Sequence, residues 1–224
     1  MTARGPARPP EPTHYRFIYL LVAQFGLILI YPFVAGERSR EGVGAAFVLV
    51  MLVAALWAVA RDRRIVTIAL VFAVPAIIGN VVTALTPGNP LFVPTVVFGL
   101  LFVVFVTSVI FRGVVMSPVV TTETLYGAIT AYLFLGISWT WAYVLVELLH
   151  PGSFRSADGV VKPPDLTFLS FITLTSVGYG DILPVSPYAR SLAILEAIAG
   201  QMYLAVFIAR LVGLHGQSVE PPAD

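Results

Sequence analysis

The sequence predicts an all-α membrane protein with six transmembrane helices and a shorter, re-entrant helix between the fifth and the sixth. Apolar residues make up 58% of its 224 residues and charged residues only 11%, whereas a soluble domain carries about 25% charged residues. Six apolar stretches also approach the roughly 20 residues that a helix needs to cross the hydrocarbon core. This composition excludes a disordered chain, and it leaves too few polar side chains to cover an ordinary soluble protein.

Five of these stretches are almost wholly apolar, and the last carries a few polar residues. They run over residues 15–35, 43–60, 65–85, 92–111, 125–149 and 188–214. Charged or Gly- and Pro-rich segments separate them, as is typical of loops. The segment 165–175 is apolar but too short to span. Pro163 and Pro164 precede it, which predicts a helix start with Asp165 as the N-cap.

Pro and Arg dominate residues 1–14, which predicts a disordered N-terminal arm. A signal peptide is the alternative, but the apolar run that follows is longer than the roughly 7–15 residues of such a segment and lacks a cleavage pattern. We expect a four-helix membrane domain at 15–112 and a second membrane domain at 122–214. A tail at 215–224 is too short for a folded regulatory domain.

The basic residues predict the orientation in the membrane. With the N-terminus in the cytoplasm and six crossings, eight of the 13 Lys and Arg residues lie on the cytoplasmic side. The positive-inside rule therefore favours two cytoplasmic termini. Twelve of the 13 are Arg, which suggests a GC-rich bacterial source and hence the bacterial inner membrane.

Other function classes find little support in the sequence. The net charge of +1 gives no reason to expect a nucleic-acid partner. The chain has no Cys, which excludes thiolate metal sites and thiol catalysis. Its histidines, His14, His150 and His215, do not have the spacing of metal ligands. We see no catalytic constellation, so we expect a protein that is not an enzyme and has no cofactor.

The segment Thr175-Ser-Val-Gly-Tyr-Gly-Asp181 lies directly after the short helix. It resembles the selectivity filter of the potassium-channel family, and a span before it, a half-helix and a span after it extend the resemblance over residues 122–214. The resemblance implies a tetrameric, passive potassium channel with K+ as the permeant ion. It assigns ion binding to Thr175, Ser176, Val177, Gly178, Tyr179 and Gly180, and the outer mouth to Asp181.

The residue types suit this chemistry. Backbone carbonyls replace the hydration shell of an ion only if consecutive ones point to one side, and Gly178 and Gly180 supply the positive φ that this needs. The carbonyls of Ser176, Val177, Gly178 and Tyr179 would form stacked rings, with the Ser176 hydroxyl innermost. One chain supplies a quarter of each ring, so we expect a homotetramer or a close hetero-tetramer. The negative end of the half-helix dipole would favour a cation beneath the filter.

One departure from the family concerns the innermost ring. Ser176 stands where the family usually has Thr, so the hydroxyl is kept but the methyl group that restricts its rotamer is lost. We predict a potassium pore with a slightly looser innermost site. Asp181 is expected to draw cations to the mouth and to bond to the half-helix, with a simple turn-forming Asp as the alternative.

The last span carries the remaining candidates. Gly200 resembles the inner-helix gating hinge of the family, with close helix packing as an equally favoured alternative. One helical face is expected to line the cavity, or else to pack on the fifth span: it carries Gln201, Leu204, Ile208 and Val212. Glu196 is expected to brace the half-helix or to be protonated within the bundle, and Glu147 to be solvated.

The first four spans resemble a degenerate voltage-sensor bundle. The stretch 92–111 holds no charge and only Arg112 stands at its inner end, whereas a voltage sensor needs several arginines. We therefore expect a channel that is not strongly voltage-gated. The alternatives are a non-selective monovalent cation channel, a non-conducting membrane sensor or scaffold, and an ion-coupled transporter.

Overall fold

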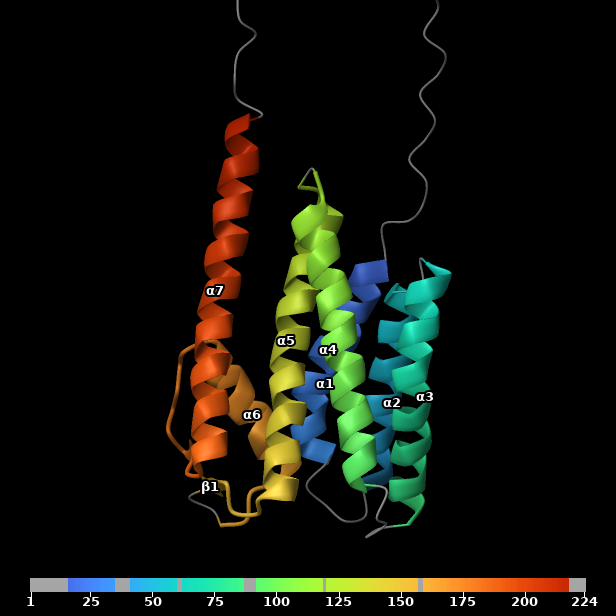
Figure 1. Cartoon of the computed structure of the whole chain (residues 1–224), viewed down its shortest axis with the longest axis vertical. Coiled ribbons are helices and arrows are strands. Elements are labelled where there is room, and N and C mark those ends of the chain that lie inside the picture. The colour runs from blue at the N-terminus through green and yellow to red at the C-terminus, as the bar shows by residue number, and fades with distance from the viewer. Residues whose placement is uncertain are drawn as a thin grey trace, which may run out of the picture.

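The computed structural model describes residues 16–34, 41–59, 62–86, 92–118, 120–156 and 159–217. Seven helices and one two-stranded antiparallel sheet form in this part of the chain (Figure 1). They are α1 (Arg16–Val34), α2 (Glu41–Val59), α3 (Arg63–Leu85), α4 (Phe92–Met116), α5 (Thr122–Leu149), β1 (Phe154–Ser156), α6 (Pro163–Leu174), β2 (Ile182–Pro184) and α7 (Pro187–Gln217). The predicted arm 1–14 and residues 218–224 of the predicted tail lie outside the described residues.

Each predicted helix is present, and most boundaries agree within a few residues. Four helices, α3, α4, α5 and α7, are long and apolar enough to cross a membrane. The described apolar stretches of α1 and α2, Phe17–Ile30 and Val48–Trp57, are shorter. Helix α4 continues five residues beyond the predicted end and stops at Met116, two residues before Pro118. The ring of a proline clashes with a helical conformation of the residue before it, so the helix ends here.

Helices α1 and α4 pack on α5 and α2 and α3 lie beyond them, with α6 and α7 on the other side of α5 (Figure 1). Helix α4 packs directly on α5, its neighbour in sequence, because only residues 117–121 separate them. Polar contacts join α1 and α4 to α5: the Gln24 amide donates to the Thr130 carbonyl at 3.3 Å, and the hydroxyls of Thr107 and Ser138 lie 3.3 Å apart. Thr121 caps α5 by accepting a hydrogen bond from the backbone nitrogen of Thr124 at 3.2 Å.

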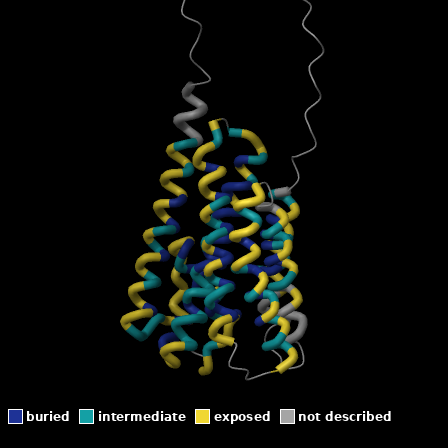
Figure 2. The backbone as a smooth tube through the Cα atoms, turned by 45° about the vertical axis from the view of Figure 1, so that its right-hand side comes forward, coloured by how far each residue is buried: buried dark blue, intermediate teal, exposed yellow. Residues whose placement is uncertain are grey.

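Burial differs sharply between the helices (Figure 2). Half of the spanning window of α5 is buried within the chain, but only 17% of that of α7. Figure 2 shows the exposed residues along the outward faces of the helices. Helix α5 is thus the central element, and α7 presents a long apolar face that the other described residues leave uncovered.

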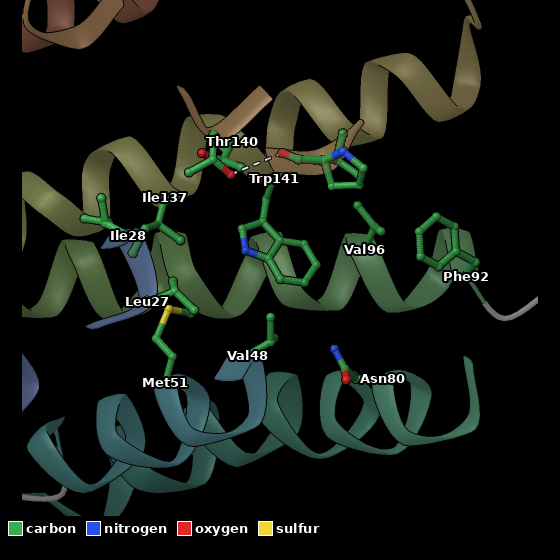
Figure 3. Close-up of a pocket in the computed structure, with 13 residues that line it drawn as sticks. Leu27, Ile28, Val48, Met51, Asn80, Phe92, Val96, Ile137, Thr140 and Trp141 are labelled. Carbon is green, nitrogen blue, oxygen red and sulfur yellow. Dashed lines mark hydrogen bonds between the residues drawn. The ribbon is translucent and has the colours of Figure 1, made fainter. Parts of the chain in front are cut away.

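A cavity of about 160 Å³ lies where the first four helices meet the beginning of α6 (Figure 3). Its walls are largely apolar, and Trp141 reaches into it from α5. Asn80 also lines it, and within the described residues the Asn80 Oδ1 atom has no hydrogen-bond partner. The N-terminal end of α6 is therefore separated from the first four helices by this cavity.

Candidate functional site

The site begins with the short helix α6. Its N-cap is Lys162 rather than the predicted Asp165, so that prediction is wrong. Pro163 takes the first helical position, where its missing N–H is no loss. This shifts Asp165 to the third position, and its carboxylate accepts a hydrogen bond from the Lys162 backbone nitrogen at 2.8 Å. The helix starts at the end of the bundle where β1 lies and stops part way along α5 and α7 (Figure 1).

The chain after α6 turns back and bonds to the helix it has just left. The backbone nitrogens of Val177 and Gly178 both donate to the Ile172 carbonyl, at 2.8 and 3.1 Å. The Ser176 nitrogen donates to the Thr173 carbonyl at 2.9 Å. The amide groups of residues 176–178 therefore point toward α6.

The carbonyl groups of the same segment are left without partners. In the described part of the chain, no hydrogen bond reaches a carbonyl oxygen of residues 175–180. Ser176, Gly178 and Gly180 have φ of 59°, 55° and 82°. Glycine adopts these angles freely, and they break the alternation of an extended chain. Six consecutive acceptors are thus available to a ligand that supplies positive charge.

The two apolar side chains of the segment point away from the body of the chain. Val177 is 55% and Tyr179 is 74% exposed. The Tyr179 ring lies parallel to that of Phe168, with centroids 6.1 Å apart. Asp181 is exposed, and its Oδ1 accepts from the Ile182 nitrogen at 3.1 Å. The bond to α6 that we expected from Asp181 is not found among the described residues.

A buried polar cluster stands behind α6. Glu196 of α7 is fully buried. Its Oε1 lies 2.6 Å from the Ser170 hydroxyl, and its Oε2 accepts a hydrogen bond from the Tyr143 hydroxyl. The cluster joins α5, α6 and α7. Glu196 therefore braces the half-helix, which was one of the two expectations for this residue.

The sequence did not indicate the partners of two further groups. Ser170 is a polar residue within an otherwise apolar helix face, and that is the signal that could have paired it with Glu196. Glu147 was expected to be solvated, but its carboxylate accepts from the backbone nitrogens of Gly152 and Phe154 at 2.8 and 3.2 Å. It therefore caps the turn before β1.

Helix α7 approaches the end of α6 closely at Gly200. A Cβ atom at this position would collide with the Leu174 carbonyl oxygen. The Tyr132 hydroxyl donates to the same oxygen at 3.3 Å. This is the close packing that we weighed for Gly200; α7 itself is unbroken from Pro187 to Gln217, and a hinge stays a prediction.

The predicted cavity face is exposed in the chain. The Gln201 Nε2 donates to the Ser176 hydroxyl at 2.9 Å, which brings α7 to the inner end of the turn. Leu204 and Ile208 follow on this helix and are 38% and 58% exposed. The Val212 side chain lies outside the described residues. At these exposures neither side chain is buried against α5.

Comparison with known proteins gives matches to the same region. Residues 119–214 match the family described as "Ion channel". Protein LctB of Bacillus caldotenax is 30% identical over 96 residues, which cover 40% of this chain and 71% of that protein.

Two named potassium channels also match, over shorter segments. The inward rectifier potassium channel Kirbac3.1 of Paramagnetospirillum magnetotacticum is 37% identical over 62 residues, 28% of this chain and 18% of that protein. Two pore potassium channel c of Oryza sativa subsp. japonica is 30% identical over 83 residues, 37% of this chain and 17% of that protein. The chain thus spans less than a fifth of either of these two relatives.

Proposed function

The chain belongs to the ion channel family, and from that premise we propose that it is a potassium-selective channel that passes K+ passively through a homotetrameric pore. Residues 15–112 would form a four-helix membrane domain and residues 122–214 the pore domain. All six long helices would cross the membrane, with α6 re-entrant and the two termini cytoplasmic. The bacterial inner membrane is the proposed location.

The observation that carries the proposal is the division of polar groups in residues 175–180. The amide hydrogens of residues 175–178 are used toward α6, whereas the carbonyl oxygens of residues 175–180 have no partner among the described residues. Backbone oxygens at this depth are tolerated only where they line a path for water or ions. Rings of such oxygens suit a cation that must exchange its hydration shell for protein ligands. The Ser176, Val177, Gly178 and Tyr179 carbonyls would hold K+, with Thr175 and Gly180 at the two ends and Asp181 at the mouth.

The exposure of α7 supports the tetramer. Large apolar residues on it, including Ile194, Ile198 and Met202, are more than half exposed in the single chain. Val177 and Tyr179 beside them are exposed as well. Three further copies around an axis would cover these surfaces and complete the oxygen rings.

A non-selective cation channel is the alternative, because Ser176 lacks the methyl group that restricts a threonine rotamer. The hydrogen bond from Gln201 to the Ser176 hydroxyl favours selectivity instead. It supplies from α7 the restriction that the missing methyl group would have given.

Ion flux from liposomes tests the proposal. The purified protein is reconstituted, and K+ and Na+ fluxes are measured with and without Ba2+. Gly178→Ala should abolish K+ flux, because Gly178 has a φ of 55° that alanine adopts poorly. Gly152→Ala is the matched control, since Gly152 has a φ of 81° in the turn before β1 and carries the same backbone strain away from the filter.

The outcomes separate the readings. The channel is supported if the wild type and Gly152→Ala both show K+ flux that Ba2+ blocks, while Gly178→Ala shows no K+ flux. Equal Na+ and K+ fluxes would replace it by the non-selective channel. No flux from a well-folded wild type would favour a membrane sensor or scaffold.

A further inference from the structure

A second and larger cavity, of about 820 Å³, lies at the opposite end of the molecule from β1 and the start of α6. It is bounded by α1, α3, α4 and the beginning of α5. Figure 1 shows that α3 begins and α4 ends at this end of the bundle, where α7 also ends. The cavity therefore sits at the level of one membrane surface, the one remote from the proposed filter mouth.

The cavity has two chemically distinct parts. Its floor is apolar, with Ile65 and Ile68 from α3 and Phe105 from α4 among its walls. Ile68 is 45% exposed to it and to the surroundings. Its rim carries the guanidinium groups of Arg64, in the first turn of α3, and Arg112, in the last turns of α4. A ligand that fills this cavity must offer an apolar chain and an anionic end.

The two arginines are available to such a ligand. Both are exposed, and no hydrogen bond or ion pair reaches either guanidinium within the described residues. The neighbouring Asp62 accepts from the Arg64 backbone nitrogen, not from its side chain. The one carboxylate on the rim, Glu123, has an interaction partner of its own. Positive charge thus exceeds negative charge around the opening.

We infer that this cavity binds the headgroup and one acyl chain of an anionic glycerophospholipid, with the lipid phosphate held by Arg64 and Arg112. Guanidinium groups bind phosphate oxygens in a fixed, two-pronged geometry. Basic pockets between transmembrane helices at the membrane surface are suited to anionic headgroups. A free phosphate ion would leave the apolar floor in water, whereas an acyl chain covers it.

The site is connected to α7. Val114 and Ser117 line the cavity, and their carbonyl oxygens accept hydrogen bonds from the Arg210 side chain of α7. A lipid bound here would contact the end of α4 and the segment between α4 and α5, to which Arg210 of α7 is hydrogen-bonded. Lipid binding would therefore influence the inner end of α7.

Lipid binding to the delipidated full-length protein tests the inference, and native mass spectrometry counts the bound molecules. Dioleoylphosphatidylglycerol should bind tightly to the wild type, and dioleoylphosphatidylcholine much less. The double variant Arg64→Gln/Arg112→Gln should bind phosphatidylglycerol roughly thirtyfold more weakly, the loss expected for two arginines at an anionic surface. Arg63→Gln is the matched control, because Arg63 is exposed and adjacent but does not line the cavity.

A second variant fills the cavity without changing any charge. Gly113 lines the cavity, and a Cβ atom added there meets nothing within 4 Å. Gly113→Leu should therefore fold normally and weaken phosphatidylglycerol binding by roughly tenfold. It keeps the test decisive if the double arginine variant fails to assemble.

Three results would overturn the inference: unchanged lipid affinity in both variants, an equal loss in Arg63→Gln, or equal binding of phosphatidylcholine. Binding of inorganic phosphate that competes fully with the lipid would replace it by a simple anion site. The measurement does not depend on ion selectivity. A failure of the proposed channel activity would leave it intact, and its own failure would leave the channel intact.

Discussion

The amide nitrogen of Gln201 donates a hydrogen bond of 2.9 Å to the hydroxyl of Ser176, so that α7 touches the inner end of the filter segment. Ser176 is the only residue other than glycine with a positive φ, 59°, in the described part of the chain. Its hydroxyl lacks the β-branch that would restrict it. The Gln201 amide therefore fixes the rotamer of the group proposed as the innermost ion ligand.

Removing this contact should reduce selectivity. In Gln201→Leu the Ser176 hydroxyl is free to rotate, so we expect the K+ to Na+ permeability ratio to fall several-fold, by roughly 1 kcal/mol for one net hydrogen bond. Reversal potentials in mixed K+ and Na+ measure it. Leu204→Ala, on the same face but without contact to the filter, should keep the wild-type ratio. An unchanged permeability ratio in Gln201→Leu would show that the hydrogen bond between Gln201 and Ser176 does not contribute to selectivity.

The same backbone angle predicts an effect of restoring threonine. A β-branched residue at a φ of 59° is a steric outlier. Ser176→Thr should therefore destabilise the assembled protein by about 1–3 kcal/mol, and Ser176→Ala by less. Thermal dissociation of the proposed tetramer, followed by size-exclusion chromatography, compares the two variants. A threonine variant more stable than wild type would contradict the backbone geometry found here.

The helices and the turn at residues 175–180 could be predicted because their signals are local. Runs of apolar residues, Pro163 before the half-helix, and the glycines at 178 and 180 each act within a few residues of themselves. The contacts that hold the site together could not be predicted in this way. Glu196 and its partners Tyr143 and Ser170 lie 53 and 26 residues apart in sequence, and only tertiary packing pairs them.

A second group of failures came from choices between locally equivalent positions. Asp165 is a good N-cap by residue type, but the two prolines before it take the first helical positions and move the cap to Lys162. Gly200 was equally compatible with a hinge and with close packing, because helix propensity alone does not say what lies opposite. The Leu174 carbonyl, 26 residues away in sequence, supplies that information.

Gly200→Ala offers a test in which two effects have opposite signs. Helix propensity favours alanine over glycine by about 1 kcal/mol in a helix interior. The added Cβ would meet the Leu174 carbonyl oxygen, however, and backbone cannot easily move away. We expect lower thermal stability and reduced K+ flux. Gly26→Ala is the control, since nothing lies within 4 Å of its added Cβ, and it should be neutral or stabilising.

The charge content of α4 predicts weak voltage dependence. Arg112 is its sole charged residue, and it lies near one end of the helix. Each elementary charge that crosses the membrane field contributes about 2.3 kcal/mol per 100 mV, so steep gating needs several such charges. Planar-bilayer recordings should give a shallow conductance–voltage relation, equivalent to about one gating charge or fewer per chain. A steep relation would show that other charges move.

Glu196→Gln and Glu196→Leu should differ in a way that reports the state of the buried carboxyl group. The Ser170 hydroxyl lies 2.7 Å from the Gly136 carbonyl as well as 2.6 Å from Glu196, and its single hydrogen serves only one acceptor. A carboxylic acid at Glu196 satisfies every member of the cluster: it donates to Ser170, which donates to Gly136, while Tyr143 donates to the other carboxyl oxygen.

A glutamine amide can make the same hydrogen bonds, donating to Ser170 and accepting from Tyr143, and it differs by one additional N–H donor. Glu196→Gln should therefore lose clearly less stability than Glu196→Leu. Glu196→Leu leaves the buried Tyr143 hydroxyl without this acceptor, while Ser170 keeps only the Gly136 carbonyl, and the variant should lose about 1–3 kcal/mol. Thermal unfolding of the reconstituted protein measures both. If Glu196→Gln loses as much stability as Glu196→Leu, the cluster holds a carboxylate rather than a carboxylic acid. A neutral amide of the same shape would then fail to replace the glutamate because it lacks the charge.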